Sequence, residues 1–175
     1  MTRLKATASG VAVTFEAAEV AALRDLARQL AEVLGGGVPD HGTDAVRDRL
    51  FPRAYVDPTE DRAEDDFQSV VHDDLVQGKS DAIRALVAAL DAGRERRGRV
   101  EVVLASAALE QWVGAMNDVR LALGVTLGVT EDSSDDGDVR SDDDPRSLGL
   151  AMYDWLTYLQ GALVDVLLAD LGDEA

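Results

Sequence analysis

Apolar residues in this chain show two periods, a two-residue alternation at the amino terminus and three-to-four-residue spacing through most of the remaining sequence. Leu4 to Ala6 and Val11 to Phe15 flank a Ser9-Gly10 turn, which predicts a short β-hairpin. From Glu16 to Leu34 apolar side chains lie three and four positions apart and Gly35 comes next, so this stretch predicts a helix. The pattern as a whole favours a mainly α fold, a single-domain helical bundle of about five helices with a small N-terminal β-hairpin or strand element.

The same spacing, with its start and stop residues, predicts the other elements. Asp57-Pro58 is a strong helix start and Gly78 a stop, so residues 57–77 and 80–93 are expected to form two separate helices. The alternating stretch from Arg99 to Leu104 predicts a strand that pairs with the amino-terminal hairpin. The remaining segments of the single domain 1–175 are a short helix at 43–51, a basic loop at 94–99, a long helix capped by Ser106, an acidic flexible loop at 130–144 and a last helix opened by Pro145.

Arg120 lies in the middle of an apolar helical face. At 100° per residue, that face also holds Leu109, Trp112, Val113, Met116, Leu123 and Leu127. An uncompensated buried cation costs several kcal/mol, so Arg120 predicts a specific carboxylate partner. We expect a buried polar network that comprises Arg120, Asn117 and a carboxylate from Asp154, Asp74 or Asp165. The pair would fix the register of the helices; the alternative is that the carboxylate of a ligand or partner reaches Arg120.

The last helix is apolar on nearly all sides, which is unusual for a surface helix. Its one narrow polar stripe consists of Asp154, Tyr158 and Asp165. We therefore expect it to be the central helix of the bundle. Aspartates at bilayer depth are costly, so the apolar stretch from Leu148 to Leu171 is not expected to span a membrane.

Charge narrows the classes of partner. The 175 residues carry 34 acidic and 17 basic side chains, a net charge of −17, and no cysteine. Such a field repels phosphate backbones and anionic lipids, so we expect no direct binding to nucleic acid and no membrane association. The basic cluster at residues 94–99 consists of Arg94, Arg96, Arg97 and Arg99. It could contact an acidic partner or the acidic loop of the same chain; the alternative is a solvated turn with no partner. The amino terminus lacks the apolar run of a secretory signal, which favours a cytoplasmic location.

Two segments are candidates for chemical sites. Residues 132–143 place Asp132, Asp136 and Gly137 at positions of a calcium-binding loop, but aspartate replaces the usual last glutamate, so a metal-free loop is favoured over calcium. Tyr55 and His72 with neighbouring aspartates resemble an acid/base group, yet no nucleophile, phosphate loop or metal-ligand spacing accompanies them. We expect no catalytic residues, no metal and no cofactor.

The helix Trp112-Val-Gly-Ala-Met-Asn-Asp-Val-Arg-Leu-Ala-Leu-Gly124 and the segment Tyr153-Asp-Trp-Leu-Thr-Tyr-Leu-Gln160 resemble those of an actinobacterial family of a domain of unknown function. Some members of that family are described as AosR-type oxidative-stress regulators. The resemblance extends over most of the chain, including Leu50-Phe-Pro-Arg-Ala-Tyr55 and His72-Asp-Asp-Leu75. It implies genes encoded near the protease adaptor ClpS and a regulatory role. The thiol-based sensing proposed for the regulators has no cysteine to act on here.

The function expected from the sequence is therefore a non-enzymatic cytoplasmic regulatory or adaptor protein. It would act through protein-protein contacts and be linked to transcription or to oxidative-stress and cysteine-metabolism control. The alternative is an unrecognised enzyme or small-ligand binder that uses Arg120 with Asp154 or Asp74. A protein partner is expected; its identity and the oligomeric state are not specified by the sequence.

Overall fold

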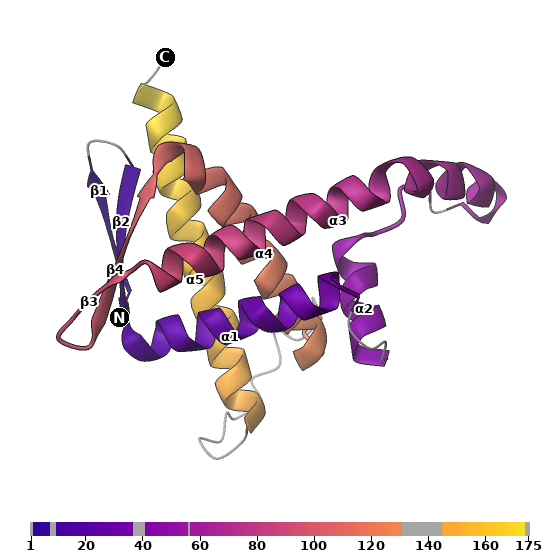
Figure 1. The fold of residues 1–175 in the computed structure, drawn as a ribbon. Helices are drawn as coiled ribbons and strands as arrows, with labels where there is room; N and C mark the ends of the chain where they lie inside the picture. The colour runs from indigo at the N-terminus through magenta and orange to yellow at the C-terminus, as the bar shows by residue number, and fades with distance from the viewer. Residues whose placement is uncertain (1, 8–9, 37–40, 56, 131–144, 174–175) are drawn as a thin grey trace.

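The computed structural model describes residues 2–7, 10–36, 41–55, 57–130 and 145–173, and these form helices around one side of a small sheet (Figure 1). The mainly α fold is confirmed. In chain order the elements are β1 (Arg3–Thr7), β2 (Gly10–Glu16), α1 (Ala17–Leu34), α2 (His41–Leu50), the 3-10 turn η1 (Pro58–Glu60), α3 (Asp61–Asp91), β3 (Arg94–Arg96), β4 (Arg99–Ala105), α4 (Ser106–Leu127) and α5 (Pro145–Asp173). The predicted acidic loop and its candidate calcium ligands lie outside the described residues, apart from Thr130.

The sheet is antiparallel with strand order β1-β2-β4-β3. The amino-terminal hairpin and its pairing with β4 are confirmed, with Val13 opposite Leu4 on one side and Val102 on the other. Buried and open positions alternate along β2 and β4, because successive side chains point to opposite faces of a strand. The inner face joins the core; its buried residues are Val11, Val13, Phe15, Val100, Val102 and Leu104.

The predicted basic loop at residues 94–99 is instead a second hairpin, β3–β4. Arg97 and Gly98 form its turn, and both have positive φ, 54° and 76°. Two successive positive φ angles match the right-handed twist of the paired strands, so this turn closes tightly. All three residues of β3 are exposed, so the strand carries no apolar alternation that could reveal it in the sequence.

The predicted break at Gly78 is wrong, since α3 runs without interruption from Asp61 to Asp91. A glycine inside a helix costs about 1 kcal/mol relative to alanine, too little to end a helix held by other contacts. Those contacts lie in its second half, where Ile83, Leu86 and Leu90 are buried. The first half extends away from the other helices (Figure 1). At the start of α4, the N-cap is Ala105 and not the expected Ser106.

The central helix is α4, not α5 as predicted. It contacts α1, α2, α3 and α5 as well as β2 and β4, whereas the main neighbour of α5 is α4. One face of α5 packs through buried Leu156, Leu159 and Leu163. Trp155 adds an edge contact with Phe15, their ring centroids 6.3 Å apart. Tyr158 and Leu168 on the opposite face of α5, and Leu148 near its start, are exposed, so the all-round apolar character of α5 does not mean all-round burial. No helix among the described residues is long and apolar enough to cross a membrane.

Candidate functional site

Arg120 joins α4 to α5 through neutral acceptors. Its Nε donates to Gln160 Oε1 at 2.9 Å, Nη1 to Tyr153 Oη at 2.9 Å and Nη2 to Asn117 Oδ1 at 3.1 Å. The guanidinium carbon also lies 5.6 Å from the centre of the Tyr153 ring, a cation–π distance. Gln160 Nε2 closes the network by donating to Asn117 Oδ1 at 3.3 Å.

The expected network is therefore corrected in its partners. The structure brings Asn117 to Arg120 as predicted, but Asp154, Asp74 and Asp165 are all exposed. Arg120 is only half-buried, so water still solvates part of its charge and three neutral oxygens suffice for the rest. Gln160 and Tyr153 carry no charge, so a search of the sequence for carboxylate partners does not find them.

A buried ion pair that the sequence did not predict lies on the other side of α4, at Asp118, two residues before Arg120. Asp118 is 5% exposed, and its Oδ1 accepts from Lys79 Nζ at 2.7 Å. The Lys79 ammonium also lies 5.8 Å from the ring centroid of Phe51. The pair ties the middle of α3 to α4. Its only signal in the sequence is that Lys79, one of two lysines, comes directly after Gly78 within a helix-forming stretch.

Tyr55 and His72 are not brought together as an acid/base pair. The Tyr55 ring meets Phe67 edge to face at 6.3 Å, and the His72 ring meets Phe51 at 5.3 Å. His72 borders a cavity of about 280 Å³ beside α2 and α3, which is also lined by Leu34, Arg47, Asp48, Phe51, Gln68, Asp73 and Val76. Arg47 is already engaged, because its Nε and Nη2 both donate to the carbonyl of Val33. Neither this cavity nor a hollow over the sheet beside β3 includes Arg120.

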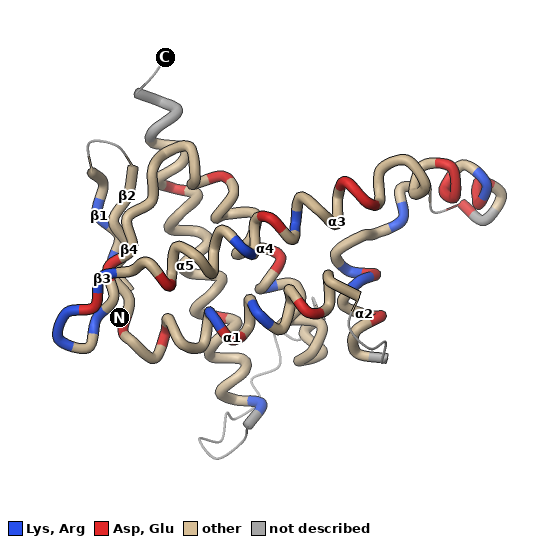
Figure 2. Tube along the Cα trace, viewed as in Figure 1, with Lys and Arg blue, Asp and Glu red and all other residues tan. Residues whose placement is uncertain are grey.

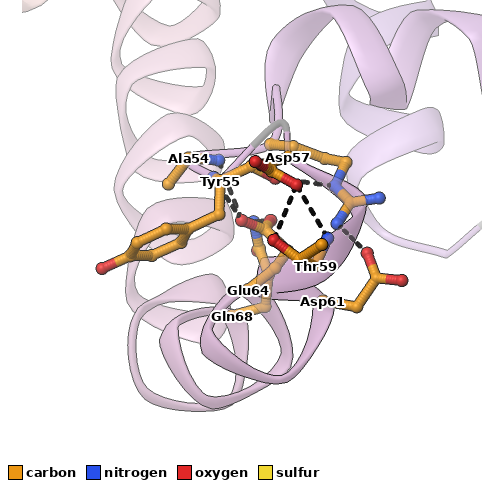
Figure 3. Close-up of polar contacts among 8 residues, drawn as sticks. Ala54, Tyr55, Asp57, Thr59, Asp61, Glu64 and Gln68 are labelled. Atoms are coloured by element: carbon orange, nitrogen blue, oxygen red, sulfur yellow. Dashed lines mark hydrogen bonds and ion pairs between the residues drawn. The ribbon is translucent and has the colours of Figure 1, made fainter.

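A carboxylate clamp fixes the chain where it enters α3 (Figure 3). Glu64 is buried, and its Oε2 accepts from the backbone N–H groups of Tyr55 at 2.8 Å and Ala54 at 3.0 Å. Gln68 Nε2 donates to the other oxygen at 2.7 Å. These donors favour the charged form, so the Tyr55 amide first, and then Gln68, lowers the pKa of Glu64 below its ordinary value of 4.5.

Two outer contacts complete the clamp. Arg53 Nη2 lies 2.6 Å from Asp61 Oδ1, and this carboxylate raises the pKa of the Arg53 guanidinium. Asp57 accepts from the amide and hydroxyl of Thr59, which caps η1 and lowers the pKa of Asp57. The segment before α3 is therefore held in one conformation against the helix.

Beyond the clamp, the outer half of α3 exposes apolar side chains on one side. Phe67 and Val70 lie one turn apart on the same side of α3 and are both exposed, Val70 at 75%, whereas the exposed Leu75 lies about 140° round the helix from Val70. Tyr55 lies beside Phe67 and is exposed as well. We call Tyr55, Phe67 and Val70 the α3 stripe. Scattered apolar residues are ordinary on a surface, whereas a contiguous set on a projecting helix is typical of a contact site.

The sheet presents a basic surface away from the α3 stripe. Figure 2 shows Lys and Arg positions along β1 and the β3–β4 hairpin, while acidic positions are spread over the helices. The outward-pointing cations of the sheet, which we call the basic sheet face, are Arg3, Lys5, Arg94, Arg96 and Arg99. The predicted arginine cluster thus becomes part of a larger surface that includes β1, because β2 and β4 join the two edge strands into one sheet.

The fold and these surfaces define a mainly α protein with a four-stranded antiparallel sheet and two exposed contact areas of different chemistry. Residues 1–167, nearly the whole chain, match the family described as a domain of unknown function, DUF2017. The chain therefore belongs to that family. A curated relative from Mycobacterium leprae, named "Putative oxidative stress regulator AosR", is 34% identical over 132 residues. The match covers 75% of this chain and 56% of the relative, so the chain spans little more than half of that protein. No solved structure matches the chain.

Proposed function

We propose that this chain is a non-enzymatic regulatory or adaptor protein of the cytoplasm that acts by binding other proteins. The observation that carries the proposal is the α3 stripe, an exposed apolar surface on a helix that projects from the core. Keeping it exposed forgoes the stabilisation of roughly 25 cal/mol for each Å² of apolar surface removed from water. A bound partner would recover that stabilisation.

Charge around the stripe indicates the chemistry of the partner. The first seventeen residues of α3, 61–77, hold six acidic side chains and a single arginine, Arg62. Asp66 and Asp74 are exposed four residues before and after Val70, so both lie about one turn from it on the same side of the helix. The stripe therefore fits an amphipathic helix with basic residues beside its apolar face. It fits a second copy of itself poorly, because a symmetric pairing of two stripes sets carboxylates against carboxylates.

The regulatory part of the proposal is supported by the family and by the printed name of the Mycobacterium leprae relative. It extends to oxidative-stress or cysteine-metabolism control and to transcription through a protein partner. Within these 175 residues no cysteine is available, so a disulfide switch cannot operate in them. A signal reaching this chain would act through protein binding instead.

The test uses a fluorescein-labelled synthetic helix with leucine on one face and lysine on the other. We expect fluorescence anisotropy to show binding to the full chain, and Val70→Asp to weaken it at least about tenfold, or about 1.4 kcal/mol. The matched control is Val103→Asp, since Val103 is also an exposed valine, 62% exposed, but lies on the sheet. Equal affinity of the two variants would contradict the proposal, as would stripe-dependent self-association in sedimentation equilibrium.

A second candidate function is a small-ligand or enzyme site at Arg120. It is favoured by one observation: the acceptors of all three Arg120 hydrogen bonds are neutral, so its charge remains available to an anion. A rise in Tm with millimolar acetate or succinate that is absent in Arg120→Met would support this candidate over protein binding.

A further inference from the structure

The basic sheet face is built by strand register. Arg3, Thr14, Glu101 and Arg94 lie opposite one another across all four strands, and Arg99 lies opposite Arg96 in the next row. Neighbouring strands lie about 4.8 Å apart, so Arg94, Arg96 and Arg99 on the paired strands β3 and β4 are close together, whereas Arg3 lies three strands, about 14 Å, from Arg94.

The side chains of two of these arginines have no hydrogen-bond or ion-pair partner among the described residues. Arg99 Nε lies 3.2 Å from Glu16 Oε1, an exposed pair. The side chains of Arg94 and Arg96, by contrast, make neither a hydrogen bond nor an ion pair with any residue that the structure describes, although their backbone pairs with β4. Both border the hollow over the sheet, which has a volume of about 610 Å³ and is otherwise lined by Thr14, Glu95, Arg99 and Glu101. The hollow is therefore bordered by guanidinium groups with free donors.

The sign of this face differs from the rest of the protein. Five of the seventeen cationic side chains point outward from the sheet, against two of the thirty-four acidic ones, Glu16 and Glu101. At physiological ionic strength charges further away than about 8 Å are largely screened. Three arginines, Arg94, Arg96 and Arg99, line the hollow against two glutamates, Glu95 and Glu101. A ligand in contact with these arginines therefore meets a small local excess of positive charge, although the whole chain carries −17.

We propose that the basic sheet face binds an acidic, extended segment of another protein, with Arg94 and Arg96 as the central contacts. Arg94 and Arg96 are two residues apart on one strand, so their side chains leave the same face about 7 Å apart. Carboxylates at alternate positions of an extended peptide repeat at that same distance. The planar guanidinium fork holds a carboxylate through two parallel hydrogen bonds.

Other occupants fit less well. Duplex DNA is a broad polyanion whose stable binding commonly uses about six to ten phosphate contacts, more than five cations interspersed with Glu16 and Glu101 can supply. A second copy of the chain would bring its own charge of −17 and meet long-range repulsion. This inference is independent of the α3 stripe, because the two surfaces share no residue.

The experiment measures anisotropy of a labelled peptide of about ten residues that alternates glutamate and serine, the repeat that an extended strand presents on one face. The variant is Arg94→Gln/Arg96→Gln in the full chain. Its matched control is Arg49→Gln/Arg62→Gln, which removes the same charge from two exposed arginines on helices. We expect the sheet variant to bind at least about tenfold more weakly, and the control to change by less than about twofold. Affinity for the wild type should fall as salt rises.

Several results would overturn the inference. These are no binding of the acidic peptide at low salt, equal losses in the sheet variant and the control, and displacement of the peptide by duplex DNA at equal phosphate and carboxylate concentration. Self-association that disappears in Arg94→Gln/Arg96→Gln would assign the face to a second copy of this chain instead. Unchanged circular dichroism and Tm of the variant would show that a loss of binding does not reflect unfolding. We expect no change, since both side chains are exposed and make no hydrogen bond or ion pair with the described residues.

Discussion

Removing either member of the Lys79–Asp118 pair should give unequal losses of stability. Lys79→Met leaves the Asp118 carboxylate buried without its cation, and breaking a fully buried pair in this way costs about 3–5 kcal/mol. The Asp118 side chain is 6% exposed but that of Lys79 is 26% exposed, so partial access of water reduces the expected cost to about 3 kcal/mol. For a chain of this length that corresponds to a fall in Tm of about 6–12 °C.

The opposite substitution is milder because lysine is flexible. Asp118→Asn keeps an oxygen acceptor in place, and the Lys79 ammonium can turn toward solvent, so we expect a loss of about 1 kcal/mol. Replacing both with apolar residues, Lys79→Met/Asp118→Leu, strands no charge and should restore stability to within about 1 kcal/mol of the wild type. The double variant is therefore expected to be more stable than Lys79→Met alone by about 2 kcal/mol or more.

Urea unfolding monitored by circular dichroism measures these differences, provided that the m-value stays constant. The control is Arg84→Met, which breaks an exposed ion pair with Asp81 on the same helix and should change stability by less than about 0.5 kcal/mol. If Lys79→Met costs no more than Arg84→Met, the pair does not hold α3 against α4 and the reasoning from burial fails.

Other substitutions test separate parts of the structure. Arg120→Ala should lower Tm by about 2–6 °C, because it removes hydrogen bonds to neutral groups worth roughly 1–1.5 kcal/mol in all. The control Asp165→Asn, at an exposed position, should leave Tm unchanged. A fall of about 15 °C for Arg120→Ala would instead indicate that Arg120 pairs with a buried carboxylate. Because the folded pKa of Glu64 is lowered, its contribution to stability is complete above pH 4.5 and lost as pH falls through the folded pKa; a carboxyl titration midpoint by NMR at or above 4.5 would contradict the clamp. Gly78→Ala should raise stability by about 0.5–1 kcal/mol, since the added methyl meets open space inside a helix, and a decrease would mean that α3 breaks there. Gly10→Ala should unfold the hairpin, because its φ is 144° and the methyl would collide with the carbonyl oxygen of Leu104; a normal melting curve would refute the register.

Elements with a local signal were predicted from the sequence. The amino-terminal hairpin and α1 combine a clear period with a turn or stop residue, and both lie where expected. The sequence did not indicate that α3 is continuous, because Gly78 is a typical helix stop residue. Contacts with α4, such as the Lys79–Asp118 pair, stabilise the helix across this glycine. The residues of β3 are exposed and charged, and they form a strand because they pair with β4. The pattern of apolar residues within β3 itself gives no indication of this pairing.

The candidate sites show the same division. The helical face of Arg120 and its contact with Asn117, three residues away on the same helix, result from periodicity. Its other partners, Tyr153 and Gln160, lie 33 and 40 residues further along, and the packing rotation of α5 decides which of its side chains meet α4. The arginine cluster was visible as a charge run, but its extension by Arg3 required the sheet to bring two distant edge strands together.

A single helix connects the two exposed surfaces. The α3 stripe lies along the first half of α3, and the basic sheet face begins three residues after the helix ends at Asp91. The part of α3 between Val70 and Asp91 is about 32 Å long at 1.5 Å per residue, more than the distance over which surface charges interact in physiological salt. Buried Ile83, Leu86 and Leu90 hold the sheet end of this helix in the core, while the Glu64 clamp holds the chain at its outer end. Because the two surfaces differ in sign and lie beyond each other's electrostatic reach, the proposed acidic segment on the sheet and the proposed basic helix on the stripe would not compete, as the proposed adaptor role requires.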